Sequence, residues 1–324
     1  MSSIVRQPVF YPVSVVFLDD SADFLHALRG FFPNAFTHHF FTSQSEARAF
    51  IEAQGARGAG HSPTSGELWS EFEKRGGNAL GKDALADARR FLQVAAIVVD
   101  YDMPGQDGLE FLASVKDAMK DANCTRILLT GTADESHAVD AFNAGLIHFY
   151  LKKSDPGMAR KLAQALANAQ RKFCAGHGHI GVHGVGAAYT DRGVAEALDA
   201  LVLRERIVEY YWRPEQNAVL TFDVTGQAGV FLAWDAHDWA AQCEVLTDEG
   251  GPAALREEME ERRIMPVFWP NEAYRPGMAN VEFAVPQPAP GAPDTWVSWT
   301  RIGSADVVPE LVPYAKWLRM QRMH

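Results

Sequence analysis

Four runs of apolar residues stand out in the first half of the chain, and polar residues close each of them. The runs occupy residues 15–18, 95–99, 127–129 and 147–151, and the last includes one histidine. Apolar runs without polar alternation are typical of strands that are buried on both faces, as in a parallel sheet. The pattern therefore predicts an α/β segment in which these runs are parallel strands.

The residues that close the runs carry charged or reactive groups. In chain order they are an acid pair, a single acid, a hydroxyl and two amines: Asp19 and Asp20, Asp100, Thr130, and Lys152 and Lys153. Because parallel sheets gather their chemistry at the carboxyl ends of the strands, we expect these side chains to converge. Adjacent carboxylates repel each other unless a cation neutralises them. A carboxylate at such a place can bind a divalent cation or attack phosphorus.

This order of strand ends resembles the receiver domain of two-component response regulators over about residues 12–175. The stretch 100–108 contains the Met-Pro and Asp-Gly pairs of the loop that follows the family's phospho-accepting aspartate, and 130–145 resembles its fourth strand and helix. The resemblance implies a flavodoxin-like fold, which is a doubly wound parallel sheet of five strands. The remaining strand is predicted at 38–42, followed by a helix from Gln44 to about Ala53.

The family's motif, matched residue by residue, implies a role for each strand-end group. Asp100 is expected to accept the phosphoryl group. Asp19 and Asp20 are expected to bind Mg²⁺ together with Asp100, and the backbone carbonyl of Asp102 to complete the metal shell. Thr130 is the expected switch hydroxyl. These roles come from the resemblance and not from the spacing of the residues.

The lysine that pairs with the phosphoryl oxygens has two candidates. Lys152 and Lys153 are neighbours, so in a strand they point to opposite faces. The spelling Gly-x-Ile-x-x-aromatic-Leu-x-Lys, found in part of the family, fits Gly145 to Lys153 without a gap, and we therefore select Lys153. Ser154 stands where the family usually has proline.

The resemblance also implies a mechanism and partners. The phosphoryl group would come from the phosphohistidine of a sensor histidine kinase or phosphotransfer protein, or from a small donor. Phosphorylation would then bias a two-state loop through Thr130 and Tyr150. The family further implies a homodimer, and a phosphoprotein of a two-component phosphorelay that signals and is not itself an enzyme.

Haloacid-dehalogenase-type phosphatases are the main alternative, because they also place Asp-x-Asp after an apolar strand. They use a nucleophilic aspartate, then a threonine or serine, then a lysine, and they need a further acid pair downstream of the lysine. The downstream candidate here is Asp248-Glu249, which runs into two glycines and has the pattern of a turn. The clear acid pair lies upstream, at Asp19 and Asp20, which favours the receiver interpretation.

Composition limits the class of protein. The 324 residues carry a formal net charge of −11 and are 47% hydrophobic, which is sufficient for two domains with their own cores. Three cysteines without close pairing predict a reducing compartment rather than a disulfide framework. No run approaches the ~20 apolar residues that a membrane span requires. We therefore expect a cytoplasmic protein without membrane contact.

Glycine-rich stretches predict the domain boundaries. We expect a receiver domain, an insertion within it, a linker and an output domain, at residues 12–175, about 54–94, 176–190 and 191–324. The insertion is either a flexible surface excursion or an added helical hairpin in which Trp69 and Phe72 contact a partner or a second subunit.

The predicted output domain is acidic and rich in tryptophan. Residues 190–324 contain 12 Lys and Arg against 21 Asp and Glu, and seven of the eight tryptophans. Most DNA-binding domains have a basic face, so no direct DNA binding is expected. Short apolar or alternating runs predict a small antiparallel sheet, in an α+β domain with an acidic helix at about 252–263. Its role is open between a protein-interaction or ligand-sensing module and an enzyme with an unfamiliar site.

Overall fold

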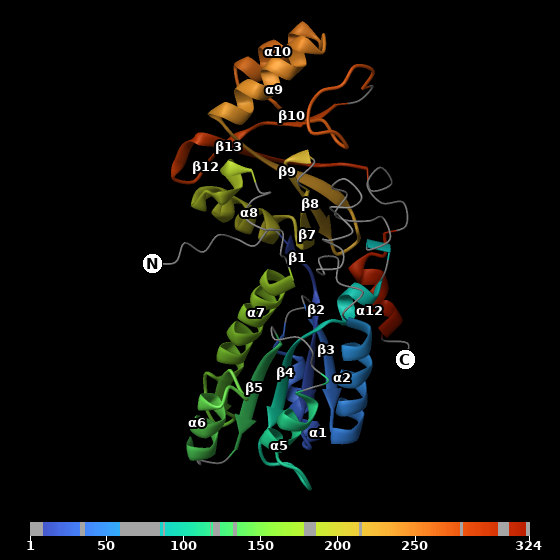
Figure 1. Ribbon diagram of the computed structural model, residues 1–324, viewed down its shortest axis with the longest axis vertical. Coiled ribbons are helices and arrows are strands. Elements are labelled where there is room, and N and C mark those ends of the chain that lie inside the picture. The colour runs from blue at the N-terminus through green and yellow to red at the C-terminus, as the bar shows by residue number, and fades with distance from the viewer. Residues whose placement is uncertain are drawn as a thin grey trace. The chain divides into compact units, whose positions relative to one another are not determined.

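The predicted parallel sheet is present in the computed structural model of the chain (Figure 1). The structure describes residues 9–32, 36–58, 85–86, 88–116, 118, 124–131, 135–177, 186–213, 216–278, 281–303 and 311–321. Five strands lie in the order β3-β2-β4-β5-β6, and every neighbouring pair is parallel. They are β2 (Val13–Leu18), β3 (Phe36–Phe41), β4 (Val94–Asp100), β5 (Thr125–Thr130) and β6 (Phe149–Lys152). The flavodoxin-like topology expected from the sequence is thus confirmed.

Helices cover this sheet and bury its apolar side chains. They are α1 (Ala22–Arg29), α2 (Gln44–Gly58), α5 (Gly108–Val115), α6 (Glu135–Asn143) and α7 (Met158–His177). Residues of α2, α5 and α6 share one apolar core with strand residues such as Val16, Ile97 and Leu128. Helix α7 packs on β4 and β6. The runs that lack polar alternation are buried from both sides, as their composition predicts.

Local sequence fixes the turns that follow the acidic strand ends. Ser21 caps α1, and its hydroxyl accepts a hydrogen bond from the Phe24 amide at 3.3 Å. Asp107 and Glu110 form a reciprocal capping box at the start of α5. Gly108 is required between them, because a Cβ there would lie 2.1 Å from the Asp100 carbonyl oxygen. The Asp-Gly pair therefore lets the loop after Asp100 turn back tightly.

The chain divides into two compact units, and each contains segments from separate parts of the sequence. One contains residues 12–65 and 88–177, and the other contains 1–11, 66–87 and 178–324. The segment expected as an insertion differs in detail, since α2 continues through Gly58 and a 3-10 helix, η1 (Ala88–Leu92), precedes β4. Trp69 and Phe72 lie outside the described residues.

The second unit is built on a six-stranded antiparallel sheet with the order β1-β7-β8-β9-β13-β12. The strands are β1 (Val9–Phe10), β7 (Ile207–Arg213), β8 (Ala218–Asp223), β9 (Ala228–Asp235), β12 (Gln287–Ala289) and β13 (Ala292–Arg301). A separate ribbon pairs β10 (Met265–Val267) with β11 (Glu282–Ala284). The helical elements are η3 (Ala187–Thr190), α8 (Arg192–Arg204), α9 (Ala236–Asp248), α10 (Ala253–Glu260) and α12 (Tyr314–Gln321). The expected α+β character is confirmed, but the edge strand β1 comes from the N-terminus.

Aromatic side chains form much of the interior of this second unit. Trp212, Trp234, Trp239 and Trp317 are buried. Trp296 packs edge-on against Trp239, and the Arg262 guanidinium lies 3.6 Å from the Trp296 ring centre. These tryptophans therefore serve packing.

The polar residues around His237 have a structural role. The Asp235 side chain accepts from the amides of His237 and Asp238, and thereby caps α9. Burial raises the pKa of the Asp238 carboxyl, whose Oδ2 accepts from the Asp235 amide at 3.1 Å and completes the cap. Among the described residues, no helix has the length and apolar character needed to cross a membrane.

Candidate functional site at the carboxyl end of the parallel sheet

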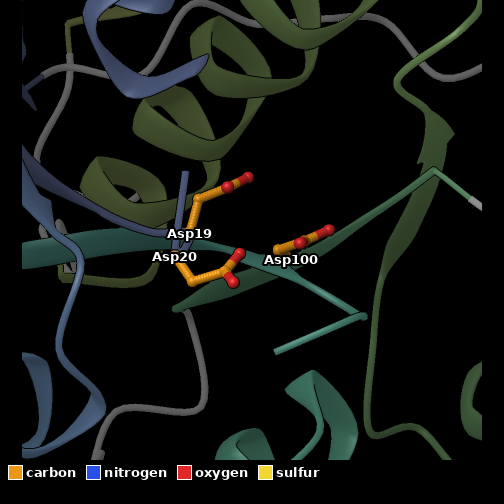
Figure 2. A group of neighbouring side chains, drawn as sticks. All are labelled: Asp19, Asp20 and Asp100. Carbon is orange, nitrogen blue, oxygen red and sulfur yellow. The ribbon is translucent and has the colours of Figure 1, made fainter. Parts of the chain in front are cut away.

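Three carboxylates gather where β2 and β4 end (Figure 2). One oxygen from each of Asp19, Asp20 and Asp100 lies within 4.8 Å of the others. We call these three residues the acid cluster. Asp19 and Asp100 are only 2% and 3% exposed, whereas Asp20 is exposed. The convergence expected from the strand ends is therefore present, with two acids inside the fold and one at its surface.

Lys153 is the lysine that reaches the acid cluster. Its Nζ lies 2.7 Å from Asp19 Oδ2 and 2.9 Å from Asp100 Oδ1. The Lys153 amide donates to the Thr130 carbonyl at 2.8 Å, which continues the pairing of β5 and β6 by one residue. Lys152 precedes it, opposite Thr130 in the strand register, so alternation directs the two lysines to different sides.

Burial and charge shift the protonation of this group of residues. The pKa of Asp100 is raised by burial and by the charge of Asp19, although the Lys153 ammonium acts in the opposite direction. Burial alone would lower the pKa of Lys153, but its contacts with Asp19 and Asp100 raise it overall. Three carboxylates against one ammonium leave a net charge of about −2 when all are ionised. Such an excess of negative charge favours a divalent cation.

The oxygen atoms of the acid cluster suit a hard cation. The Ser21 amide donates to Asp19 Oδ1 at 3.0 Å and so fixes the orientation of that carboxylate. Asp19 Oδ2 and Asp100 Oδ1 are buried, and Lys153 is the described group that approaches them. Carboxylate oxygens are the ligands that Mg²⁺ and Ca²⁺ prefer. The residues present thus fit a divalent ion bound beside Lys153.

The remaining predicted site residues lie at the same edge of the sheet. Thr130 ends β5 and is 3% exposed. The Asp102 side chain is exposed in the loop after β4, and its charge contributes to the raised pKa of Asp100 without joining the acid cluster. Tyr150 lies on β6, and its hydroxyl is buried without a hydrogen-bond partner among the described residues.

Two contacts near the site were not predicted from the sequence. The Phe24 ring centre lies 4.6 Å from Lys153 Nζ. The Tyr101 hydroxyl lies 3.1 Å from His137 Nδ1, which joins the loop after Asp100 to α6. A phenylalanine in the first turn of a helix usually indicates packing, so the sequence carries no specific signal for the first contact.

Residues 76–165 match a family model described as the response regulator receiver domain, a range that includes Asp100, Thr130 and Lys153. Asp19 and Asp20 precede that range and join the site through the fold. No curated protein matches the chain in sequence.

Solved structures resemble the chain to different extents. The Legionella pneumophila response regulator LqsR matches over 98% of this chain and 97% of its own, with 24% identity and a TM-score of 0.72. The receiver domain of Francisella response regulator 1452 covers 49% of this chain and 98% of its own, with 16% identity and a TM-score of 0.33. An adenylate cyclase from Rhodopirellula baltica covers 60% and 98%, with 18% identity and a TM-score of 0.34. The match to LqsR shows that the chain shares its fold.

Proposed function

We propose that the chain is a response regulator that accepts a phosphoryl group on Asp100 and thereby switches its second unit, and the match of residues 76–165 to the receiver-domain model supports this. The observation that carries this proposal is the acid cluster with Lys153 at its centre. A buried carboxylate at a strand end, an ammonium 2.9 Å away and two further acids are the groups that phosphoryl transfer to aspartate needs.

We assign the binding of one Mg²⁺ to Asp19, Asp20 and Asp100, with the Asp102 backbone carbonyl as a further ligand. An ion held by these residues would supply positive charge that offsets the carboxylates and the incoming phosphoryl oxygens. Asp20 is exposed, so it would hold the ion from the solvent side, and the buried Asp19 and Asp100 would hold it from within.

The transfer follows from the positions of the chain's own residues. An Asp100 oxygen attacks phosphorus in line, and the phosphorus–nitrogen bond of the donor phosphohistidine breaks as the new phosphorus–oxygen bond forms. Lys153 then exchanges its contact with Asp100 for one with a phosphoryl oxygen. Thr130 donates its hydroxyl to another oxygen, and Tyr150 moves toward the space that the hydroxyl leaves.

The partners follow from this reaction. A sensor histidine kinase or a phosphotransfer protein supplies the phosphoryl group, and a homodimer is the expected assembly. The second unit is proposed to be a protein-interaction or ligand-sensing module that does not bind DNA directly, in keeping with the net charge of −9 carried by residues 190–324. The phosphatase alternative is not favoured, because the acids around Asp100 are the upstream pair Asp19 and Asp20.

Labelling with a small phosphodonor or beryllofluoride, in the presence of Mg²⁺, tests the proposal. Asp100→Asn should abolish labelling while leaving the thermal unfolding midpoint close to that of the wild type. Asp102→Asn is the matched control, because it removes an exposed acid two residues away, and it should be labelled. Normal labelling of Asp100→Asn would remove Asp100 as the acceptor.

A further inference from the structure

The Phe24 side chain is placed differently from its neighbours on α1. Leu25 and Leu28 point into the apolar core and are buried. Phe24 is half-buried instead, and its ring centre lies 4.6 Å from the Lys153 ammonium nitrogen. The hydrogen bond from its amide to Ser21 fixes the backbone at this point, directly after the acid pair. The ring is therefore held at the acid cluster by the same cap that begins the helix.

Lys153 is enclosed by groups of two kinds. Asp19 and Asp100 contact its ammonium at 2.7 and 2.9 Å, and the Phe24 ring is within range for a cation–π contact. The lysine side chain is only 20% exposed. Lysine has a flexible stem with four carbons, so an ammonium without such contacts samples many positions. Phosphorylation would turn the Asp100 carboxylate into an acyl phosphate, so Asp19 would be the one carboxylate of the pair that still contacts the ammonium.

We propose that Phe24 is a positioning residue, whose ring keeps the Lys153 ammonium over the acid cluster when the contact with Asp100 is exchanged for one with a phosphoryl oxygen. This inference rests on the proposed phosphorylation of Asp100. A cation–π contact does not depend on the carboxylates, so it persists through the exchange. Phe24 does not touch the phosphoryl group and acts through Lys153.

The competing explanation is that Phe24 only fills space beside α1. The two explanations differ in which side chains can replace phenylalanine. Leucine keeps an apolar side chain but has no aromatic face, whereas tyrosine keeps the face. If only packing matters, Phe24→Leu preserves the function of the site, or any loss is the same with and without Lys153. If the ring holds the ammonium, Phe24→Tyr preserves the function of the site and Phe24→Leu does not.

A double-mutant cycle on beryllofluoride binding, with Mg²⁺ present, separates these explanations. Phe24→Leu is expected to weaken beryllofluoride binding about fivefold, as the loss of one partly buried cation–π contact would. Phe24→Tyr should retain binding within about twofold of the wild type. In a Lys153→Ala background, Phe24→Leu should have no further effect, because the ring has no ammonium to hold.

The outcomes decide the inference one way or the other. Wild-type binding by Phe24→Leu, or an equal loss with and without Lys153, would overturn it. Thermal unfolding of each variant identifies a loss that comes from misfolding, and Phe24→Tyr then still reports on the ring. The parent proposal is tested separately by Asp100→Asn, since binding that persists in that variant contradicts the acceptor assignment whatever Phe24 does.

Discussion

Replacing Lys153 by alanine tests how much this lysine stabilises the carboxylates of the acid cluster. In the structure this lysine is paired with two carboxylates that are 2% and 3% exposed. Removing one partner of a buried ion pair leaves an uncompensated charge and costs about 3–5 kcal/mol. The Lys153 side chain reaches solvent over a fifth of its surface, so the lower end of the range applies. We expect Lys153→Ala to lower the free energy of unfolding by about 3 kcal/mol in buffer without divalent ions.

The same substitution should have the opposite effect on cation affinity. Without Lys153 the net charge of the site is about −3 instead of about −2, and no ammonium competes for Asp19 and Asp100. At an effective dielectric constant of about 20, two unit charges 4 Å apart interact with an energy of about 4 kcal/mol, and solvent screening removes a large part of it. We therefore expect the Mg²⁺ dissociation constant to fall at least about tenfold, and Mg²⁺ to restore most of the lost stability.

Two measurements on matched variants test this reasoning. Urea unfolding with and without Mg²⁺ gives the stability, and isothermal titration gives the Mg²⁺ affinity of the wild type, Lys153→Ala and Lys152→Ala. Lys152→Ala should leave the Mg²⁺ affinity unchanged, because Lys152 precedes the cluster-facing position in the strand register. Tighter Mg²⁺ binding in Lys152→Ala but not in Lys153→Ala would refute the assignment of the lysine.

Two further predictions concern other parts of the chain. Burial lowers the pKa of His39 to about 4, so between pH 6.5 and 4 the unfolded chain binds a proton that the folded chain does not, and stability falls as the pH falls. Between pH 7 and 5, the free energy of unfolding of His39→Gln should fall by about 1–2 kcal/mol less than that of the wild type, as urea unfolding measures it. An equal loss in both proteins would contradict this. Phe10 stacks on Tyr210 with their ring centres 5.4 Å apart, so Phe10→Ala should destabilise the second unit by about 2 kcal/mol. Phe31 is exposed, so Phe31→Ala should cost less than about 0.5 kcal/mol. Tryptophan fluorescence in urea reports the second effect, and an unchanged midpoint for Phe10→Ala would exclude it.

The parallel sheet could be predicted because its signals are local. A run such as 95–99 lacks polar alternation, and the polar residue that closes each run lies where a parallel sheet collects its functional groups. The choice of Lys153 over Lys152 came from the resemblance, because a spelling found in part of the receiver family fits Gly145 to Lys153 without a gap. The structure places Lys153 beside Asp19 and Asp100. Their chemical roles remain predictions.

Other features depend on contacts that local patterns do not encode. Strand β1 has two residues and therefore no readable period, and its pairing with β7 joins positions about 200 residues apart. Helix α2 was expected to end near Ala53, before the glycines, yet it continues to Gly58. The Phe24 contact requires the fold to bring α1 beside the end of β6, and no periodicity of α1 encodes that proximity.

The most direct test of the account is to locate the phosphoryl group. Full-length protein treated with a small phosphodonor and Mg²⁺ can be digested and analysed by mass spectrometry, with the acyl phosphate trapped by reduction. The account predicts one modified residue, Asp100, and no modification when Mg²⁺ is chelated. Modification at another residue, or the same labelling in Asp100→Asn, would contradict it.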